Sequence, residues 1–174
     1  MIRIASVEKE SIVDGEGIRY TIFTQGCSHN CLGCHNPKTH DFKGGYDVDD
    51  MEIYNDILEN PLLDGITLSG GDPLFQAKKL INLAEMVKDK GYTIWAYTGF
   101  VFDEFLNYIN NEPCDSRVND DMIELLKYID VIVDGPFILE QRTVEALYKG
   151  STNQRLVDVT KSLANNIVIE YIPE

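Results

Sequence analysis

The sequence has no apolar run long enough to cross a membrane and no excess of positive charge. A membrane-spanning helix needs about 20 consecutive, mostly apolar residues. The chain carries 15 Lys and Arg against 29 Asp and Glu, which gives a formal net charge of −14. Because nucleic acids and anionic lipid surfaces attract basic proteins, we expect neither as the main partner. The first residues also lack the apolar core of a secretory signal, which predicts a cytoplasmic protein.

Cysteine is scarce as well, with four residues in 174. Three of them, Cys27, Cys31 and Cys34, fall within eight residues, whereas Cys114 stands alone in a polar stretch. In a reducing cytoplasm such a cluster binds metal more often than it forms a disulfide framework. We therefore expect a metal centre at the three clustered cysteines and no ligand role for Cys114.

Strand and helix patterns alternate along the chain, which predicts one α/β domain over residues 1–174. The strands are expected in the apolar, β-branched stretches at 2–7, 20–24, 65–69, 92–97, 131–133 and 167–172. The helices are expected at 49–59, 74–90, 103–109, 121–128 and 139–148, and loops at 35–46 and 150–155. This is too few strands for a closed eight-stranded barrel, so we expect an open, partial (β/α) barrel of about five to six mostly parallel strands.

Four of the expected strands end in a loop that contains glycine. These loops begin at Gln25-Gly26, Gly70-Gly71, Thr98-Gly99 and Asp134-Gly135, and the first of them runs straight into the clustered cysteines. Because the carboxyl ends of parallel strands form the ligand-binding face of α/β folds, we expect these loops to line one rim.

The C-x3-C-x2-C spacing favours an iron–sulfur cluster over a structural zinc site. Closed zinc sites use four ligands, usually as two separated pairs, and thiolates are also the ligands that iron–sulfur clusters prefer. With three cysteines, one iron keeps an open position, which in metal sites implies a bound substrate or cofactor. The alternative is a zinc site completed by one of the chain's three histidines, namely His29, His35 or His40. Of these, His29 is expected to face solvent.

Several motifs together resemble the radical S-adenosylmethionine (SAM) superfamily. Its marks are the cysteine spacing and the Gly-Gly-Asp-Pro turn at 70–73 that follows a strand. The chain is most similar to the activating proteins of anaerobic ribonucleoside-triphosphate reductases, a family of glycyl-radical activases. The blocks that carry this similarity lie, in order, at 12–19, 27–36, 67–74, 94–100, 132–135 and 150–154.

The resemblance implies a 4Fe-4S cluster held by Cys27, Cys31 and Cys34, with SAM bound at the fourth iron. It further implies that an electron from the cluster cleaves SAM to methionine and a 5′-deoxyadenosyl radical. That radical would remove a hydrogen from the C-terminal glycine loop of an anaerobic ribonucleotide reductase, with a flavodoxin or ferredoxin type electron donor. This abstraction needs no protein acid or base, so no catalytic residue is predicted.

The expected SAM contacts come from three loops. They are Gly33, Cys34, His35, Gly70, Gly71, Asp72 and Thr98. Backbone without a Cβ can approach the ligand closely, and a carboxylate suits the ammonium of SAM. Alternatives are an activase of another glycyl-radical enzyme and a small-molecule radical SAM enzyme. From another class, the chain could be a non-catalytic iron–sulfur electron carrier or a zinc-binding module.

Overall fold

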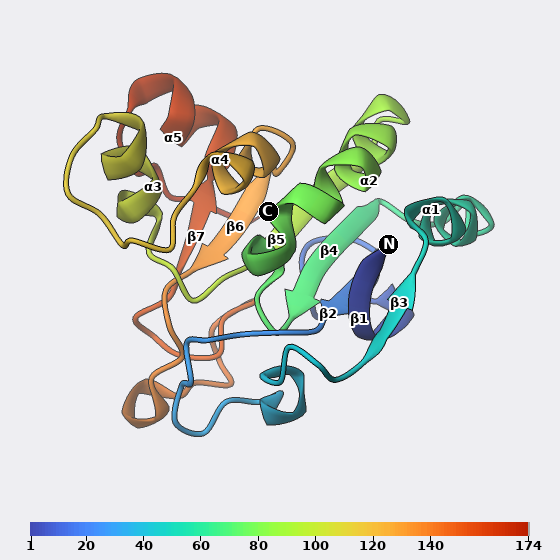
Figure 1. The fold of residues 1–174 in the computed structure, drawn as a ribbon, viewed down its shortest axis with the longest axis horizontal. Helices are drawn as coiled ribbons and strands as arrows, with labels where there is room; N and C mark the ends of the chain where they lie inside the picture. The colour runs from blue at the N-terminus through green and yellow to red at the C-terminus, as the bar shows by residue number, and fades with distance from the viewer. Residues whose placement is uncertain (174) are drawn as a thin grey trace.

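The computed structural model, which describes residues 1–173, shows one seven-stranded sheet with helices packed on it (Figure 1). The strands are β1 (Ile2–Ser11), β2 (Arg19–Thr24), β3 (Tyr46–Val48), β4 (Gly65–Gly70), β5 (Thr93–Tyr97), β6 (Val131–Asp134) and β7 (Arg155–Asp158). The helices are α1 (Asp50–Leu58), α2 (Ala77–Asp89), α3 (Phe102–Ile109), α4 (Asp120–Leu126) and α5 (Val159–Asn165). Short 3-10 turns lie at η1 (Pro37–Thr39), η2 (Pro73–Gln76) and η3 (Leu139–Gln141).

The sheet has a parallel centre and antiparallel edges. Its order is β3-β1-β2-β4-β5-β6-β7, with β2, β4, β5 and β6 parallel to one another. The outer strands β1, β3 and β7 pair antiparallel with their neighbours. The α/β class is therefore confirmed, but the expected strand count of five to six is too low. Within residues 1–173 the sheet is open, with β3 and β7 at its edges, and closure toward a partial barrel stays a prediction.

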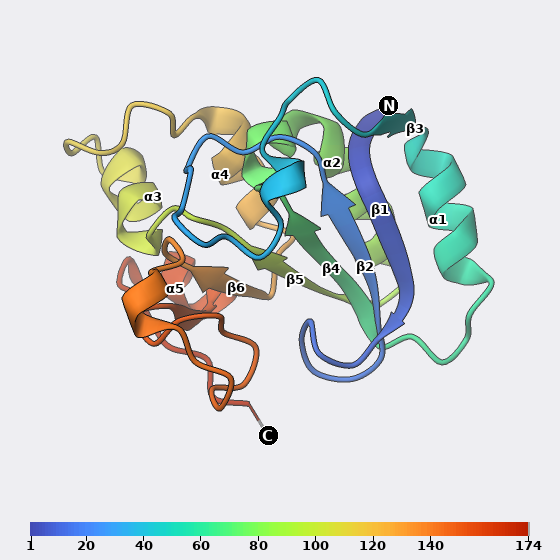
Figure 2. The ribbon, with the colours of Figure 1, turned by 90° about the horizontal axis from the view of Figure 1, so that it is seen from below.

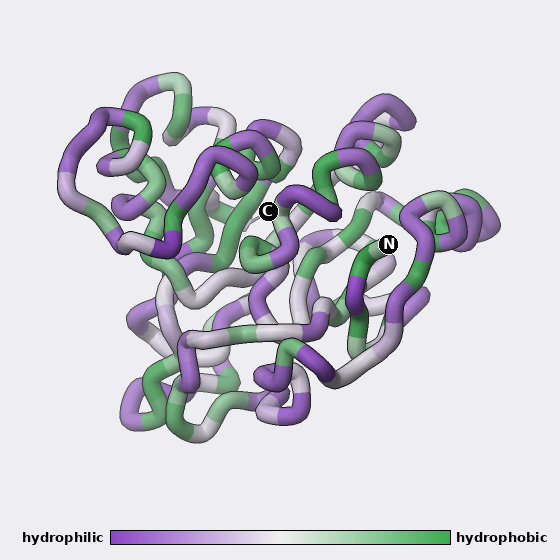
Figure 3. Tube along the Cα trace, viewed as in Figure 1, coloured by the Kyte–Doolittle hydropathy of each residue, from purple (hydrophilic) through white to green (hydrophobic). Residues whose placement is uncertain are grey.

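Helices α1, α2 and α4 pack in a row on one side of the sheet, with α2 in the middle (Figure 2). The buried stripe of α2 is the one expected from its spacing, namely Leu80, Leu83, Ala84 and Val87. In Figure 3 the strands are largely apolar, and apolar and polar residues alternate along the helices. Each apolar CH₂ that is buried contributes about 0.8 kcal/mol to stability. In the part of the chain that the structure describes, none of the helices is both long and apolar enough to cross a membrane.

The chain after β6 departs most from the sequence prediction. A helix at 139–148 is wrong, because only η3 forms there. An antiparallel bridge between Arg142 and Ser151 then turns the chain back on itself. The final strand expected at 167–172 is too long, because only residues 169–171 pair with β7. They form one antiparallel bridge, between Glu170 and Val157, and two backbone hydrogen bonds, from Asp158 N to Ile169 O (2.9 Å) and from Tyr171 N to Leu156 O (2.8 Å). Two short strands were not predicted. β3 begins at the last residue of the loop expected at 35–46, and β7 begins at the last residue of the loop expected at 150–155.

Candidate functional site

The loops that follow β2, β4, β5 and β6 surround one cavity of about 550 Å³. In Figure 1 the arrowhead of β4 points toward these loops, away from the helices. The expectation that the cysteine loop and the glycine loops share one rim is confirmed. From those loops, the lining includes Cys27, Cys31, Cys34, Gly70, Gly71, Thr98, Gly99 and Gly135.

The cysteine loop leaves β2 through Gly26, whose φ of +108° is a conformation that favours glycine. The start of the loop is fixed by two backbone hydrogen bonds, from Gly26 N to Thr39 O (2.8 Å) and from Cys27 N to His40 O (3.1 Å). All three thiols are half-buried and border the cavity. They therefore face a common space from a loop anchored to the sheet.

Burial changes the acidity of two of these thiols. Desolvation raises the pKa of Cys27 to about 11, and the pKa of Cys31 is raised for the same reason. Both thiols are therefore protonated at neutral pH in the metal-free chain. Because the thiolate is the metal ligand, binding a metal there releases protons.

The donor set fits a cluster, because thiolates are the ligands that iron–sulfur clusters prefer and three cysteines border one space. Within residues 1–173, no group of three or more His, Cys, Asp or Glu side chains is placed to hold a metal ion. In a 4Fe-4S cluster each thiolate binds its own iron, so the cysteines need only surround a shared space. A backbone amide also donates to one of the three sulfurs, from Asn36 N to Cys34 Sγ at 3.4 Å. Such bonds tune iron–sulfur clusters.

Gly70 and Gly71 bring two loops into close contact. A Cβ on Gly70 would lie 2.4 Å from the backbone nitrogen of Thr24, and one on Gly71 would lie 2.5 Å from Gly26 O. Gly70 also has a φ of +97°. The structure thus gives a physical reason for this glycine pair, which is the close approach of the β4 loop to the cysteine loop.

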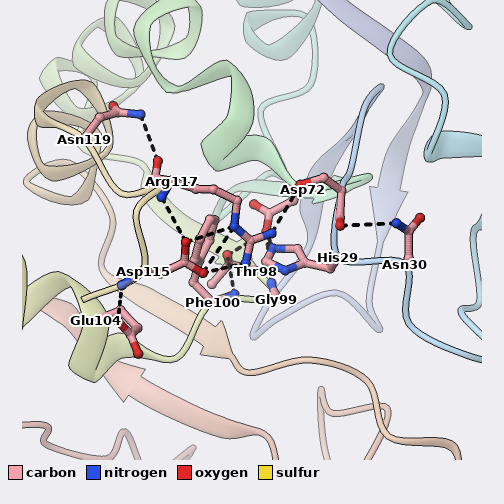
Figure 4. A network of polar contacts seen from close by, with 11 residues as sticks. His29, Asn30, Asp72, Thr98, Gly99, Phe100, Glu104, Asp115, Arg117 and Asn119 are labelled. Carbon is pink, nitrogen blue, oxygen red and sulfur yellow. Dashed lines mark hydrogen bonds and ion pairs between the residues drawn. The ribbon is translucent and has the colours of Figure 1, made fainter. Parts of the chain in front are cut away.

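The carboxylate of Asp72 is the centre of a buried polar network (Figure 4). Its Oδ2 accepts hydrogen bonds from Thr98 Oγ1 (2.8 Å), Gly99 N (3.0 Å) and His29 Nε2 (2.8 Å). Its Oδ1 accepts from Leu74 N at 3.0 Å and so caps η2. The His29 side chain is only 7% exposed, so the expectation that it faces solvent is wrong, because Asp72 holds it inside.

Of the remaining residues that the sequence analysis singled out, some line the cavity and others do not. His35 and Thr98 line it, whereas Gly33, Asp72 and Cys114 are not among the lining residues. Gly33 has a φ of +73°, and a Cβ there would lie 2.9 Å from a methyl carbon of Leu139.

Sequence reasoning missed the segment 143–149, which lines the other side of the cavity together with Phe137. The rule that strand-end loops form the ligand face already pointed there, because this segment belongs to the long connection after β6. The helix expected at 139–148 hid that signal.

Comparisons with known proteins agree with an iron–sulfur site. The family model described as "4Fe-4S single cluster domain" matches residues 13–157. A protein of Haemophilus influenzae named anaerobic ribonucleoside-triphosphate reductase-activating protein is 37% identical over 153 residues, covering 82% of this chain and 89% of its own. Proteins of the same name are 33% identical in Enterobacteria phage T4 (83% of this chain, 86% of theirs) and 31% identical in Escherichia coli (82% and 90%).

Among solved structures, QueE from Escherichia coli matches with a TM-score of 0.47 and 14% sequence identity. The match covers 76% of this chain and 70% of that one.

Proposed function

The chain belongs to the family of anaerobic ribonucleoside-triphosphate reductase-activating proteins, and from this premise we propose that it generates a glycyl radical on an anaerobic ribonucleotide reductase. In this proposal it does so by cleaving SAM at a 4Fe-4S cluster. The observation that carries the proposal is the single cavity bordered by three cysteines and by the loops of four parallel strands.

Cys27, Cys31 and Cys34 would hold three irons of the cluster. When bound, the cluster supplies the electron that splits SAM into methionine and a 5′-deoxyadenosyl radical. The chain's own contribution is to hold the three thiolates around one space and to leave the fourth iron without a protein ligand. Cys114, outside the cavity lining, is not needed for this.

The rest of the cavity would bind SAM. Its volume of about 550 Å³ lies within the range of roughly 300–1,000 Å³ that is usual for cofactor sites. Gly70, Gly71 and Thr98 border the space beside the cysteines, and Cys34 borders it from the cysteine loop. There they would contact the methionine part of SAM.

The adenine would lie near His35. Its ring centroid is 4.8 Å from that of Phe137, and both residues line the cavity. A flat aromatic base stacks well on such rings. Gly33 and Asp72 do not line the cavity, so their proposed effect on SAM is indirect. Gly33 gives the cysteine loop its turn, and Asp72 places a negative charge behind the glycine loops.

The mouth of the cavity suits a protein segment as the substrate. Exposed apolar side chains stand on both sides of it, Ile12 and Val13 on the β1–β2 connection and Val144 and Leu147 on the segment 143–149. In the proposal, the C-terminal glycine loop of the reductase enters between them and leaves little room for water. The proposed electron donor is of the flavodoxin or ferredoxin type.

Anaerobic reconstitution tests this function. The full chain is loaded with iron and sulfide, reduced, and incubated with SAM. A four-iron spectrum with SAM-dependent release of 5′-deoxyadenosine is expected. A cluster without SAM cleavage would indicate an electron carrier, and a stable zinc-only protein would indicate a zinc module, so either result contradicts the proposal. Release of 5′-deoxyadenosine without a glycyl signal on the reductase would indicate another radical SAM enzyme.

Replacing single cysteines separates the three ligands from the fourth cysteine. Cys27→Ser, Cys31→Ser and Cys34→Ser should each lose most of the bound iron, because a serine hydroxyl is a poor iron ligand. Cys114→Ser is the matched control and should keep the wild-type iron and sulfide content. Loss of the cluster in Cys114→Ser would contradict the ligand set.

A further inference from the structure

Asp72 is one of the most deeply buried carboxylates of the chain, with 1% of its surface exposed. A buried charge is costly unless hydrogen bonds satisfy it, and both oxygens of Asp72 are satisfied. Three of its four partners belong to loops that border the cavity: His29 on the cysteine loop and Thr98 and Gly99 on the β5 loop. Asp72 itself follows the β4 loop. One carboxylate therefore ties three loops together.

The imidazole of His29 is enclosed on its other sides as well. Its ring centroid lies 4.7 Å from that of Phe100, edge to face, and 5.4 Å from that of Phe75. Gly99 leaves the space for the ring, because a Cβ there would lie 2.5 Å from a His29 ring carbon. The φ of Gly99 lies outside the left-handed region, so close packing against His29, not backbone strain, is what excludes a side chain at this position.

Arg117 contacts two neighbours of His29, namely Phe100 and Ser28. Its guanidinium lies over the ring of Phe100 at 4.9 Å, and its Nη1 donates to Ser28 Oγ at 3.2 Å (Figure 4). Ser28 and His29 are the two residues that follow Cys27, and Cys31 comes two residues later. The stretch between two of the cysteines is thus held by side chains from three separate parts of the chain.

We propose that His29, clamped by Asp72 in the space that Gly99 leaves, is a positioning residue that fixes the cysteine loop against the β4 and β5 loops. This sets where Cys27 and Cys31 stand before any cluster is bound. The inference rests on the proposed function, because it takes these cysteines as cluster ligands. His29 itself touches no iron and acts through the loop.

Hydrogen exchange on the metal-free full chain tests the clamp without any activity measurement. His29→Leu should speed exchange of the hydrogen-bonded amides of the cysteine loop, Cys27 N and Cys34 N, by about 10- to 100-fold, as expected when a hydrogen bond to a charged group is lost. His29→Gln can still donate to the carboxylate and should recover most of the protection. Gly99→Ala should push the ring out and resemble His29→Leu while leaving the carboxylate in place.

A double-mutant cycle distinguishes a clamp from two independent effects. If His29 and Asp72 act as one unit, Asp72→Asn in the His29→Leu background adds little further exchange at Cys27 N and Cys34 N. Asp130→Asn is the matched control, because Asp130 also pairs with a cation (Lys88) and accepts a backbone amide (Ile94 N), but at the start of β6. It should lower the global stability without singling out the cysteine loop.

Reconstituted protein gives a second readout. In His29→Leu and Gly99→Ala, a ferrous chelator should remove iron at least several-fold faster than from wild type, and His29→Gln should lie close to wild type. Unchanged exchange in His29→Leu, or effects of His29→Leu and Asp72→Asn that simply multiply, overturns the clamp while the proposed function stands. A wild-type chain that forms no four-iron cluster overturns the proposed function itself.

Discussion

Gly70 and Gly91 both have a positive φ, but their surroundings differ. A Cβ at Gly91 meets nothing within 4 Å, whereas one at Gly70 meets the backbone of Phe23 and Thr24 at 2.4–2.6 Å. Gly91→Ala should therefore lower the free energy of unfolding by about 1 kcal/mol through backbone strain alone. Gly70→Ala adds a collision with backbone atoms that cannot move aside.

For Gly70→Ala we expect a loss of more than about 3 kcal/mol, or no folded protein. Urea unfolding of both variants measures the difference. Equal losses in Gly70→Ala and Gly91→Ala would contradict the close approach of the β4 loop to β2. Gly91→Ala should also keep the wild-type iron content, since it lies at the end of α2, away from the cavity.

Asp115 gives a prediction that depends on pH. The hydrogen-bonded ion pair with Arg117 lowers the pKa of Asp115 to about 2 from an ordinary value of 3.8. Because the pKa is lower in the folded state, the pair stabilises the fold above about pH 4, and this contribution is lost as the pH falls toward 2. Carboxyl NMR on the metal-free chain at pH 3 should find Asp115 ionised.

In Arg117→Gln the same carboxyl should titrate near its ordinary value. A wild-type midpoint near 3.8 would show that the ion pair does not form in solution.

At the scale of elements, local signals predicted the first half of the fold well. The α2 stripe and the Asp49 cap of α1, whose carboxylate accepts from Met51 N at 3.0 Å, are set by neighbours in sequence. The short strand β7 was missed because its stability comes from pairing with β6, more than 20 residues earlier. Helix α5 was missed although a local residue caps it, since Asp158 Oδ1 accepts from Lys161 N at 2.9 Å. The cysteines and glycine loops could be read from the sequence. The contact between His29 and Asp72, 43 residues apart, could not.

Arg19 links three strands through its side chain, and no pattern in the sequence predicts this role. It is 1% exposed at the start of β2, where its side chain donates to Thr67 Oγ1 in β4 and to Thr93 O in β5. Burial lowers its pKa to about 10, so it remains charged at neutral pH. The three parallel strands are thus tied together at the end opposite the cavity.

Arg19→Met should lower the free energy of unfolding by about 2–4 kcal/mol, because it leaves buried acceptors without donors. Lys127→Met is the control, since Lys127 forms an exposed ion pair with Glu124 and its replacement should change the free energy of unfolding little. Chemical denaturation measures both. A loss in Arg19→Met no larger than in Lys127→Met would contradict this link between the strands. Folded Arg19→Met should still bind iron.

At the scale of the whole molecule, the four parallel strands at the centre of the sheet end in loops that surround one cavity. Helices α1, α2 and α4 pack on one side of the sheet and stabilise it. The −14 net charge and the apolar mouth of the cavity both favour a protein segment over nucleic acid as the substrate. The family and the cavity therefore support the central proposal, that this chain places a radical on a glycine of a reductase.

The most direct measurement is electron paramagnetic resonance of an anaerobic ribonucleotide reductase after anaerobic incubation with the reconstituted chain, SAM and a reductant. We expect a glycyl radical signal that requires SAM, persists in Cys114→Ser and disappears in Cys31→Ser. No glycyl signal from a chain that carries its full four-iron cluster, or the same signal without SAM, would contradict the claim.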